Sequence, residues 1–507
     1  MSLATIYSRA KVGLESPLVS VEVHLSPGIP GFSIVGLAET SVKESKDRVR
    51  SAIINCGYEF PSRKIIVNLA PADLPKEGGR FDLPIAIGIL AASDQIPKAE
   101  LNNYEFAGEL ALSGELRKIT GEIPLAIAAR DDKRILVLPK CNAKQAAWVD
   151  EASIIAMHHL NQLFAHFANQ QPLPLVEKPL ATPTAIRQAK DMKDVMGQPL
   201  AKRALELAAS GGHNLLFVGP PGTGKTMLAS RLPGILPDMT AEEALQSAAI
   251  QSICGQDVSD SQFSLRPFRA PHHTASAVAL VGGGSYPNPG EISLAHNGVL
   301  FLDELPEYDR KVLDVLREPM ESGEVTISRV LHKTTYPAKF QLVAAMNPSP
   351  TGFYTDKRSS PEQILRYLNK LSGPFLDRID IQLEVSRLAK GVWNDNDQFN
   401  ENSETIRTRV QNCRNIQLAR QGKANAHLTS PELKVHCHIN ESDCEFLELA
   451  VEKIGLSTRA HHKILKIART IADMNNIKTI QRQHIVEALS YRAMDRLIRH
   501  LTDSLIG

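Results

Sequence analysis

The stretch Gly219-Pro220-Pro221-Gly222-Thr223-Gly224-Lys225-Thr226 matches the phosphate-binding pattern G-x-x-x-x-G-K-[ST] at every position. An apolar run at 215–218 predicts a buried strand before it, and the run at 227–232 predicts a helix after it. In such a turn, backbone N–H groups and the helix N-terminus surround a polyphosphate. We therefore expect ATP at this loop, with Lys225 at the β- and γ-phosphates and the Thr226 hydroxyl on Mg²⁺.

Two further strands end in polar residues of the kind that complete a nucleotide site. The run at 299–302 is followed by Asp303 and Glu304, and the run at 340–346 is followed by Asn347. An acid beside the phosphate loop holds Mg²⁺, so this role falls to Asp303, and Glu304 is placed to polarise an attacking water. Asn347 is placed to orient that water, although Asn-Pro is also an ordinary turn.

Length and composition restrict the class of protein. A chain of 507 residues suggests about three domains. The net charge of +1 excludes a global polyanion-binding signature, so any contact with nucleic acid must be local. The six cysteines are scattered without CxxC pairs, which favours a reducing compartment and argues against zinc. The longest apolar run, at 83–92, is too short to span a bilayer. We expect a cytoplasmic protein without membrane contact.

The pattern along the chain predicts a multidomain α/β protein. Residues 1–168 mix short strands and helices, as an α+β domain does. Residues 169–190 contain four prolines among polar residues and form a semi-extended linker. Residues 191–392 form the nucleotide-binding α/β core, and residues 393–507, after an Asn/Asp-rich boundary, form a helical domain.

Basic residues between and after the nucleotide motifs are candidates for contact with DNA. Gly and Pro place the segment 266–291 in loops, and the segment 323–337 has the pattern of a hairpin. Exposed loops carrying cations suit a pore that holds a strand; a structural lid is the alternative. Adjacent histidines without further ligands make a metal site improbable. The candidates are Arg266, Arg269, His272, His273, Arg329 and Lys333.

Two arginines and one basic helix lie in the second half of the chain. Arg378 is a candidate for donation to a neighbouring subunit's γ-phosphate, or for an ion pair with Asp377 or Asp380. Arg459 begins a predicted helix and is a candidate for reaching a nucleotide. Along that helix Lys463, Lys466 and Arg469 form a basic stripe. A solvated face is its more usual explanation.

The whole set of motifs resembles a known family. The segments RPFRAPHHTAS, PGEISLAHNGVLFLDELPE, FQLVAAMNPSP, SGPFLDRIDI and LSTRAHHKILKIARTIADM are similar to those of magnesium-chelatase-like AAA+ ATPases of the YifB/ComM type. The resemblance implies that Asn347, Arg378 and Arg459 are sensor 1, arginine finger and sensor 2. It also implies a homo-hexameric ring that uses ATP and Mg²⁺ to move along single-stranded and branched DNA. Such rings promote branch migration during natural transformation, with recombination proteins as possible partners.

Two departures limit what the resemblance implies. Residues 1–168 resemble the proteolytic domain of Lon-type proteases, but the nucleophile falls near Arg80 and its lysine partner near Ile123, and neither activates a hydroxyl. Many relatives carry four cysteines where this chain has Ser349, Thr351, Lys357 and Ser359, so no zinc is expected. A chelatase-like motor and an unfoldase acting on a protein partner stay as alternatives.

Overall fold

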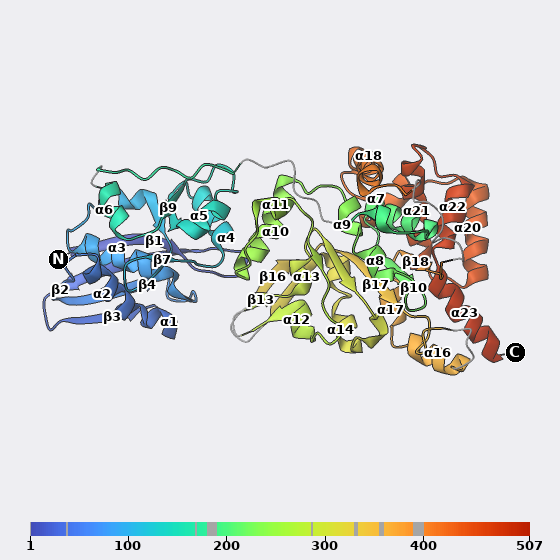
Figure 1. Cartoon of the computed structure of the whole chain (residues 1–507), viewed down its shortest axis with the longest axis horizontal. Coiled ribbons are helices and arrows are strands. Elements are labelled where there is room, and N and C mark those ends of the chain that lie inside the picture. Colours follow the sequence, from blue (N-terminus) through green and yellow to red (C-terminus); the bar gives the residue numbers. More distant parts are fainter. Residues whose placement is uncertain are drawn as a thin grey trace.

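The computed structural model describes residues 2–36, 39–167, 170–179, 190–284, 287–328, 333–353, 359–388 and 400–506. Three units follow one another along the long axis of the molecule (Figure 1): an N-terminal domain, a central core and a helical region at the C-terminal end. This arrangement confirms the predicted multidomain α/β class. In the described residues, no helix combines the length and apolar character needed to cross a membrane.

The N-terminal domain is built on a seven-stranded mixed sheet in the order β3-β4-β2-β1-β5-β8-β9. β2 pairs antiparallel with β1 and β4, and the other neighbours are parallel. Along β2 every second side chain is buried, because Val19, Val21, Val23 and Leu25 all point to the core face of the sheet. The strands are β1 (Ser2–Arg9), β2 (Leu18–Ser26), β3 (Gly31–Val35), β4 (Lys64–Ala70), β5 (Tyr104–Phe106), β8 (Ile135–Pro139) and β9 (Ile154–Met157), with a separate ribbon of β6 (Glu109–Leu110) and β7 (Leu116–Arg117).

The apolar helix α3 (Asp82–Ala92) is buried along its whole length and packs on β1 and β2. The other helices of the domain are α1 (Thr40–Lys43), α2 (Ser45–Asn55), α4 (Glu122–Asp131), α5 (Lys140–Ala146) and α6 (Asn161–Phe167). The first part of the predicted linker belongs to this domain, because the Val176 N–H donates to the Ile154 carbonyl at 2.8 Å. Residues 180–189 lie outside the described residues, as do residues 394–399 of the predicted boundary at 394–404.

The core holds a five-stranded sheet in the order β11-β14-β17-β10-β18, in which all neighbours are parallel. Buried parallel strands read as continuous apolar runs, which is why the sequence reveals most of them. The sequence predicts β10, β14 and β17 but not β18, and not β11, whose two residues Phe268–Arg269 fall in a segment predicted to form loops only. The strands are β10 (Leu215–Val218), β11 (Phe268–Arg269), β14 (Val299–Leu302), β17 (Gln341–Met346) and β18 (Ile381–Glu384).

Helices and two ribbons surround this sheet. The predicted hairpin exists as the antiparallel pair β15 (Glu324–Ser328) and β16 (Lys333–Pro337), and a smaller ribbon joins β12 (Gly282–Gly283) to β13 (Asn288–Pro289). The helices are α7 (Pro199–Gly211), α8 (Lys225–Ala229), α9 (Leu232–Ile235), α10 (Ala241–Ile253), α11 (Asp260–Phe263), α12 (Ala277–Val281), α13 (Glu291–Leu294), α14 (Arg310–Val315), α15 (Pro319–Ser322), α16 (Pro361–Leu368) and α17 (Gly373–Leu376).

The C-terminal region is helical, as predicted, and it shares one hydrophobic cluster with α7 and one face of the core sheet. The helices are α18 (Ser403–Gln421), α19 (Ser430–His436), α20 (Glu441–Ile454), α21 (Thr458–Met474), α22 (Arg482–Ser490) and α23 (Ala493–Ile506). The N-terminal domain instead contacts the insertion around α10 and α11. There the Gly121 N–H donates to the Ser252 carbonyl at 2.9 Å, and Trp148 packs on Phe263 with ring centroids 4.3 Å apart.

Candidate active site at the carboxyl edge of the core sheet

The phosphate loop joins β10 to α8 and is shaped by glycine. Gly222 and Gly224 have φ angles of +80° and +85°, in the left-handed region that favours glycine. A Cβ on Gly219 would lie 2.3 Å from the Val385 carbonyl oxygen, so this position also requires glycine. The loop therefore leads directly from a buried strand into the N-terminus of α8, as the motif requires.

Lys225 lies beneath this loop and is nearly buried, at 8% exposure. Its ammonium donates to the carbonyls of Gly219 and Pro220, at 2.6 and 2.9 Å, and to the Asn347 side-chain oxygen at 3.2 Å. Burial lowers the pKa of Lys225, and the charges of Asp303 and Glu304 oppose this shift only in part. Because its hydrogen-bond partners are neutral oxygens, the ammonium is suited to an incoming polyphosphate.

The Thr226 hydroxyl donates to Asp303 Oδ2 at 2.6 Å. These two oxygens belong to α8 and to the end of β14, so the parallel sheet brings together residues 77 positions apart. A hydroxyl paired with a carboxylate beside a phosphate loop is the donor set that holds Mg²⁺ in P-loop enzymes. The residues present therefore fit a magnesium nucleotide.

Glu304 follows Asp303, directly after the end of β14. Its backbone lies in the left-handed region, with φ at +52°, and its side chain is 56% exposed. The carboxylate faces His273, whose Nδ1 lies 3.4 Å from Glu304 Oε2. The loop that carries His273 is fixed by the Tyr308 hydroxyl, which donates to the Pro271 carbonyl at 2.7 Å. The neighbouring His272 ring lies 4.1 Å from that of His273 and its Nδ1 contacts the Thr274 hydroxyl.

The sequence does not reveal this pairing of His273 with the acid. His273 follows β11, which is the strand adjacent to β14 in the sheet. Recognition of β11 would have placed both residues at the same edge, but two residues next to Pro and Arg carry too weak a strand pattern. The structure thus assigns His273 to the surroundings of the nucleotide site.

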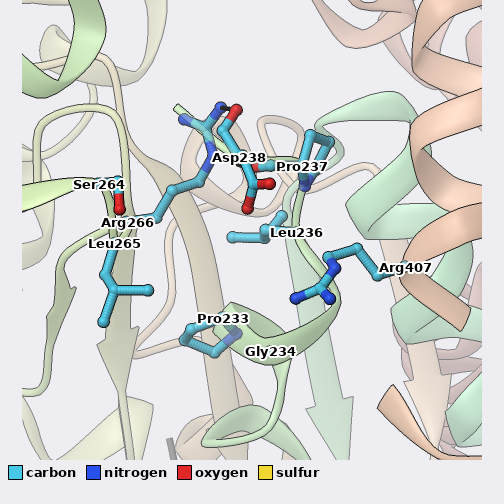
Figure 2. A pocket seen from close by; sticks show the side chains of 9 residues that line it. All are labelled: Pro233, Gly234, Leu236, Pro237, Asp238, Ser264, Leu265, Arg266 and Arg407. Atoms are coloured by element: carbon cyan, nitrogen blue, oxygen red, sulfur yellow. Dashed lines mark hydrogen bonds between the residues drawn. The ribbon is translucent and has the colours of Figure 1, made fainter. Parts of the chain in front are cut away.

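Arg266 and Arg269 are held by other groups of the core. Arg266 donates to the carbonyls of Pro237, Asn297 and Asp238 and pairs with Glu243 at 3.0 Å. Figure 2 shows its guanidinium beside Asp238, on the wall of a small cavity that Arg407 enters from the other side. This cavity measures about 30 Å³, which is room for roughly one water.

Arg269 forms a two-pronged ion pair with Glu291, at 2.6 and 2.7 Å. Contact with DNA by Arg266 or Arg269 would break these bonds. Lys333 begins β16 and is exposed, whereas Arg329 lies outside the described residues.

Arg378 lies at the opposite, amino edge of the core sheet. Its carbonyl accepts from the side chain of Asn214, which directly precedes β10. Its guanidinium donates to the carbonyls of Arg317 and Pro374 and pairs with Glu321 at 2.7 Å. The ion pair therefore forms with Glu321 rather than with Asp377 or Asp380. The length of β10, about 3.3 Å per residue, separates Arg378 from the phosphate loop of its own chain.

Arg459 lies at the same edge. It is exposed in the first turn of α21, and the capping residue Ser457 donates to Asp377 at 3.2 Å. Within the described ranges, no hydrogen bond or ion pair engages the Arg459 side chain. Both arginines are thus remote from the nucleotide of their own chain.

The basic stripe of α21 is neither a solvated face nor a free surface for DNA. Lys463 pairs with the buried Asp380, and Lys466 donates to the Ala426 carbonyl. Arg469 is 3% exposed and pairs with Asp473. The expectation of a solvated face is wrong, because periodicity shows which residues share a face but not what packs on it.

The positions that correspond to the Lon-type dyad and to the cysteine cluster make other contacts in this structure. Arg80 is 5% exposed and donates to the Thr120 carbonyl at 2.6 Å, and Ile123 is fully buried. Gly121, between Thr120 and Ile123, is bonded to the core helix α10. At the positions that match the cysteines, Ser349 contacts Thr351 at 3.1 Å and Thr351 contacts Ser359 at 3.5 Å, so hydroxyl groups meet there. Lys357 lies outside the described residues.

Comparison with known proteins agrees with this geometry. Residues 191–392 match the family described as "Magnesium chelatase, subunit ChlI", residues 21–142 match "Subunit ChlI of Mg-chelatase", and residues 400–492 match the C-terminal part of ChlI. The chain is 54% identical to "Competence protein ComM" of Haemophilus influenzae, over 99% of this chain and 100% of that protein. It is 53% identical to "Uncharacterized protein YifB" of Escherichia coli, over 99% of both chains.

A more distant relative shows the limit of the likeness. The "Magnesium-chelatase 38 kDa subunit" of Cereibacter sphaeroides is 24% identical and covers 61% of this chain and 92% of that protein. The match of the core implies ATP hydrolysis with Mg²⁺. The chain belongs to the YifB/ComM family of proteins related to the magnesium-chelatase subunit ChlI.

Proposed function

We propose that this protein is an ATP-driven DNA motor that works as a homo-hexameric ring and promotes branch migration of recombination intermediates, as in natural transformation. The main structural support for a motor is the contact between Glu304 and His273. It links the residue that would activate water to a loop which continues into α12 and the ribbon β12–β13. A substrate that moves this loop would change the position of the base.

The residues of the site divide the chemistry between them. Lys225 and the loop N–H groups would hold the β- and γ-phosphates, and Thr226 with Asp303 would hold Mg²⁺, which neutralises charge on the phosphoryl group when bound. Asn347 would orient the attacking water. Glu304 would accept its proton, once its carboxylate has left His273, because a base acts only within hydrogen-bond reach of the proton it takes.

We assign Arg378 and Arg459 to the nucleotide of a neighbouring subunit. Their position at the amino edge supports donation in trans, which requires a ring or another oligomer. Arg459 is exposed and needs no rearrangement, whereas Arg378 must exchange its ion pair with Glu321 for a phosphate.

DNA as the substrate is supported by the name of the Haemophilus influenzae relative, a competence protein, and by its full-length similarity. Among the candidates for DNA contact, His272 and Lys333 are exposed. We therefore expect these two side chains to contact DNA in the channel of the ring. Arg266 and Arg269 would contribute indirectly, by fixing the loops.

Stimulation of ATP hydrolysis by DNA tests the proposal. We expect single-stranded DNA and a four-way junction to raise the turnover of the wild-type protein, and a Glu304→Gln variant to stay far below the wild type with either. If no form of DNA changes the rate of ATP turnover, the proposal of a DNA motor is wrong. Stimulation by a protein or tetrapyrrole-binding partner alone would favour the unfoldase or chelatase-like alternative.

A further inference from the structure

The N-terminal domain carries a groove that the ATPase site does not use. It has a volume of about 440 Å³ and lies between the edge strand β3, helix α2 and the segment 60–63 that leads into β4. Gly31 pairs with Lys64 in the sheet, and Lys64 pairs with Ser26 near the start of β1. The strand β3 and the helix α2 lie in the part of the domain that is near the N-terminus and remote from the core (Figure 1).

Two aromatic rings form the floor of this groove. Phe32 and Phe60 have centroids 6.2 Å apart, both side chains are half-buried, and both pack on the edge of the domain's hydrophobic cluster. Near them, Ile54 is 50% exposed. The two rings thus add partly exposed apolar surface to the groove, and the Arg50 guanidinium covers part of the Phe60 ring.

The walls of the groove carry three cations and one acid: Lys46, Arg50 and Arg63 against Asp47. The Arg50 guanidinium lies over the Phe60 ring, 5.5 Å from its centroid. Within the described residues, none of the three cations forms an ion pair. This differs from the core, where Arg266, Arg269 and Arg378 are each paired with a glutamate.

From this geometry we propose that the groove binds a single strand of nucleic acid. Such a strand carries flat apolar faces next to regularly spaced negative charges, so bases would stack on Phe32 and Phe60 while Lys46, Arg50 and Arg63 contact phosphates. The inference rests on the proposed function and adds to it a second binding site for DNA. The ring would hold one strand in its channel, and this groove would hold a separated strand away from the ATPase.

Binding of a labelled oligothymidylate to the full-length protein without nucleotide tests the inference. The double variant Arg50→Glu/Arg63→Glu reverses two exposed groove cations. The matched control Lys133→Glu/Lys140→Glu makes the same change in charge at two exposed positions of the same domain that have no ion pair among the described residues. We expect roughly tenfold weaker binding for the groove variant, and binding close to wild type for the control. Equal losses in both variants would overturn the proposal.

A second variant tests stacking separately from charge. Phe32→Leu/Phe60→Leu keeps apolar side chains but removes the flat rings. It should weaken binding of oligothymidylate by roughly tenfold, and it should leave binding of an abasic strand of the same length unchanged. Equal loss with the abasic strand would contradict stacking. Competition by polyglutamate as strong as that by oligothymidylate would identify an acidic peptide as the occupant instead.

Measuring whether DNA stimulates ATP hydrolysis shows whether a negative result concerns the groove alone or also the proposed function. If DNA stimulates the wild-type protein and the groove variants bind the oligonucleotide like wild type, only the groove is excluded. If DNA neither stimulates nor binds the wild-type protein, both proposals fail.

Discussion

The two edges of the core sheet both carry charged and polar side chains, and they differ in how those side chains are used. At the carboxyl edge, Thr226, Asp303 and Glu304 are exposed enough to exchange partners, and Lys225 donates only to neutral oxygens. At the amino edge, Asp380 is 1% exposed and lies between His213 and Lys463. The side chains at the carboxyl edge are therefore able to bind a ligand, whereas those at the amino edge connect the core to the helical region.

At the amino edge, the buried charge of Asp380 stabilises the fold through contacts within the chain. Burial alone would raise the pKa of Asp380, but Lys463 and His213 hold it well below its ordinary range. His213 contacts Asp380 through Nδ1 at 3.1 Å and Thr470 of α21 through Nε2 at 2.8 Å. Every group in this set has a partner within the chain. The same residue types are therefore catalytic candidates at one edge and internal supports at the other.

The largest effect is expected for Arg378, which lies at the amino edge but is assigned to a neighbour's carboxyl edge. Arg378→Ala should lower ATP turnover by about 10³- to 10⁵-fold, as removal of an arginine finger does, and leave nucleotide binding intact. Steady-state turnover and binding of a fluorescent nucleotide measure the two quantities.

Mixed rings test donation in trans. Subunits with Arg378→Ala keep Glu304, and subunits with Glu304→Gln keep Arg378, so mixing the two inactive variants should restore part of the activity. If mixing restores none, Arg378 does not act across the interface, and its pair with Glu321 is only structural.

Glu304→Gln should lower turnover by about 10²- to 10⁴-fold, because the amide cannot accept a proton. Nucleotide affinity should stay near that of the wild type, since the contact between Thr226 and Asp303 is untouched. The control is Glu307→Gln, three residues on, whose carboxylate lies 3.9 Å from Lys370 at the surface. A similar loss in both variants would place the effect in the local fold rather than in the base.

Asp380→Asn should have the opposite profile, with lower stability and unchanged nucleotide affinity in the folded protein. Removing one partner of a buried ion pair leaves Lys463 uncompensated, which costs about 3 to 5 kcal/mol of unfolding free energy. Urea unfolding followed by circular dichroism measures this loss. Asp377→Asn is the control, since Asp377 is less buried and, among the described residues, its side chain accepts only from Ser457. Loss of nucleotide binding without loss of stability would contradict the separation of the two edges.

Acid should weaken the amino edge through His296, whose side chain is buried. Burial lowers its pKa to about 4, and its Nδ1 accepts from the Lys339 N–H at 3.0 Å. Because the unfolded imidazole has a pKa of about 6.5, the unfolded chain binds more protons between about pH 6.5 and 4. The unfolding free energy should therefore fall across this window, by about 3 kcal/mol from this group.

The variant His296→Gln checks that assignment. Its unfolding free energy should be lower than that of the wild type at neutral pH and should fall less steeply towards pH 4. A slope as steep as that of the wild type would assign the acid sensitivity to other groups.

The sequence predicted the carboxyl edge because its signals are local. The phosphate loop, Asp303, Glu304 and Asn347 each follow a run of apolar residues, and parallel strands necessarily bring their carboxyl ends together. The pairs Lys463 with Asp380 and Arg378 with Glu321 join residues far apart in the chain, so no local pattern reveals them. The strand β11 was missed because two residues beside proline carry almost no periodicity.

The most direct test of the central claim is ATP-driven movement of a labelled four-way DNA junction by the purified protein. We expect the wild-type protein to convert the junction to its branch-migrated products with ATP, and the Glu304→Gln variant to bind the junction without converting it. A wild-type protein that hydrolyses ATP in the presence of the junction and leaves the junction unchanged would contradict the proposed DNA motor.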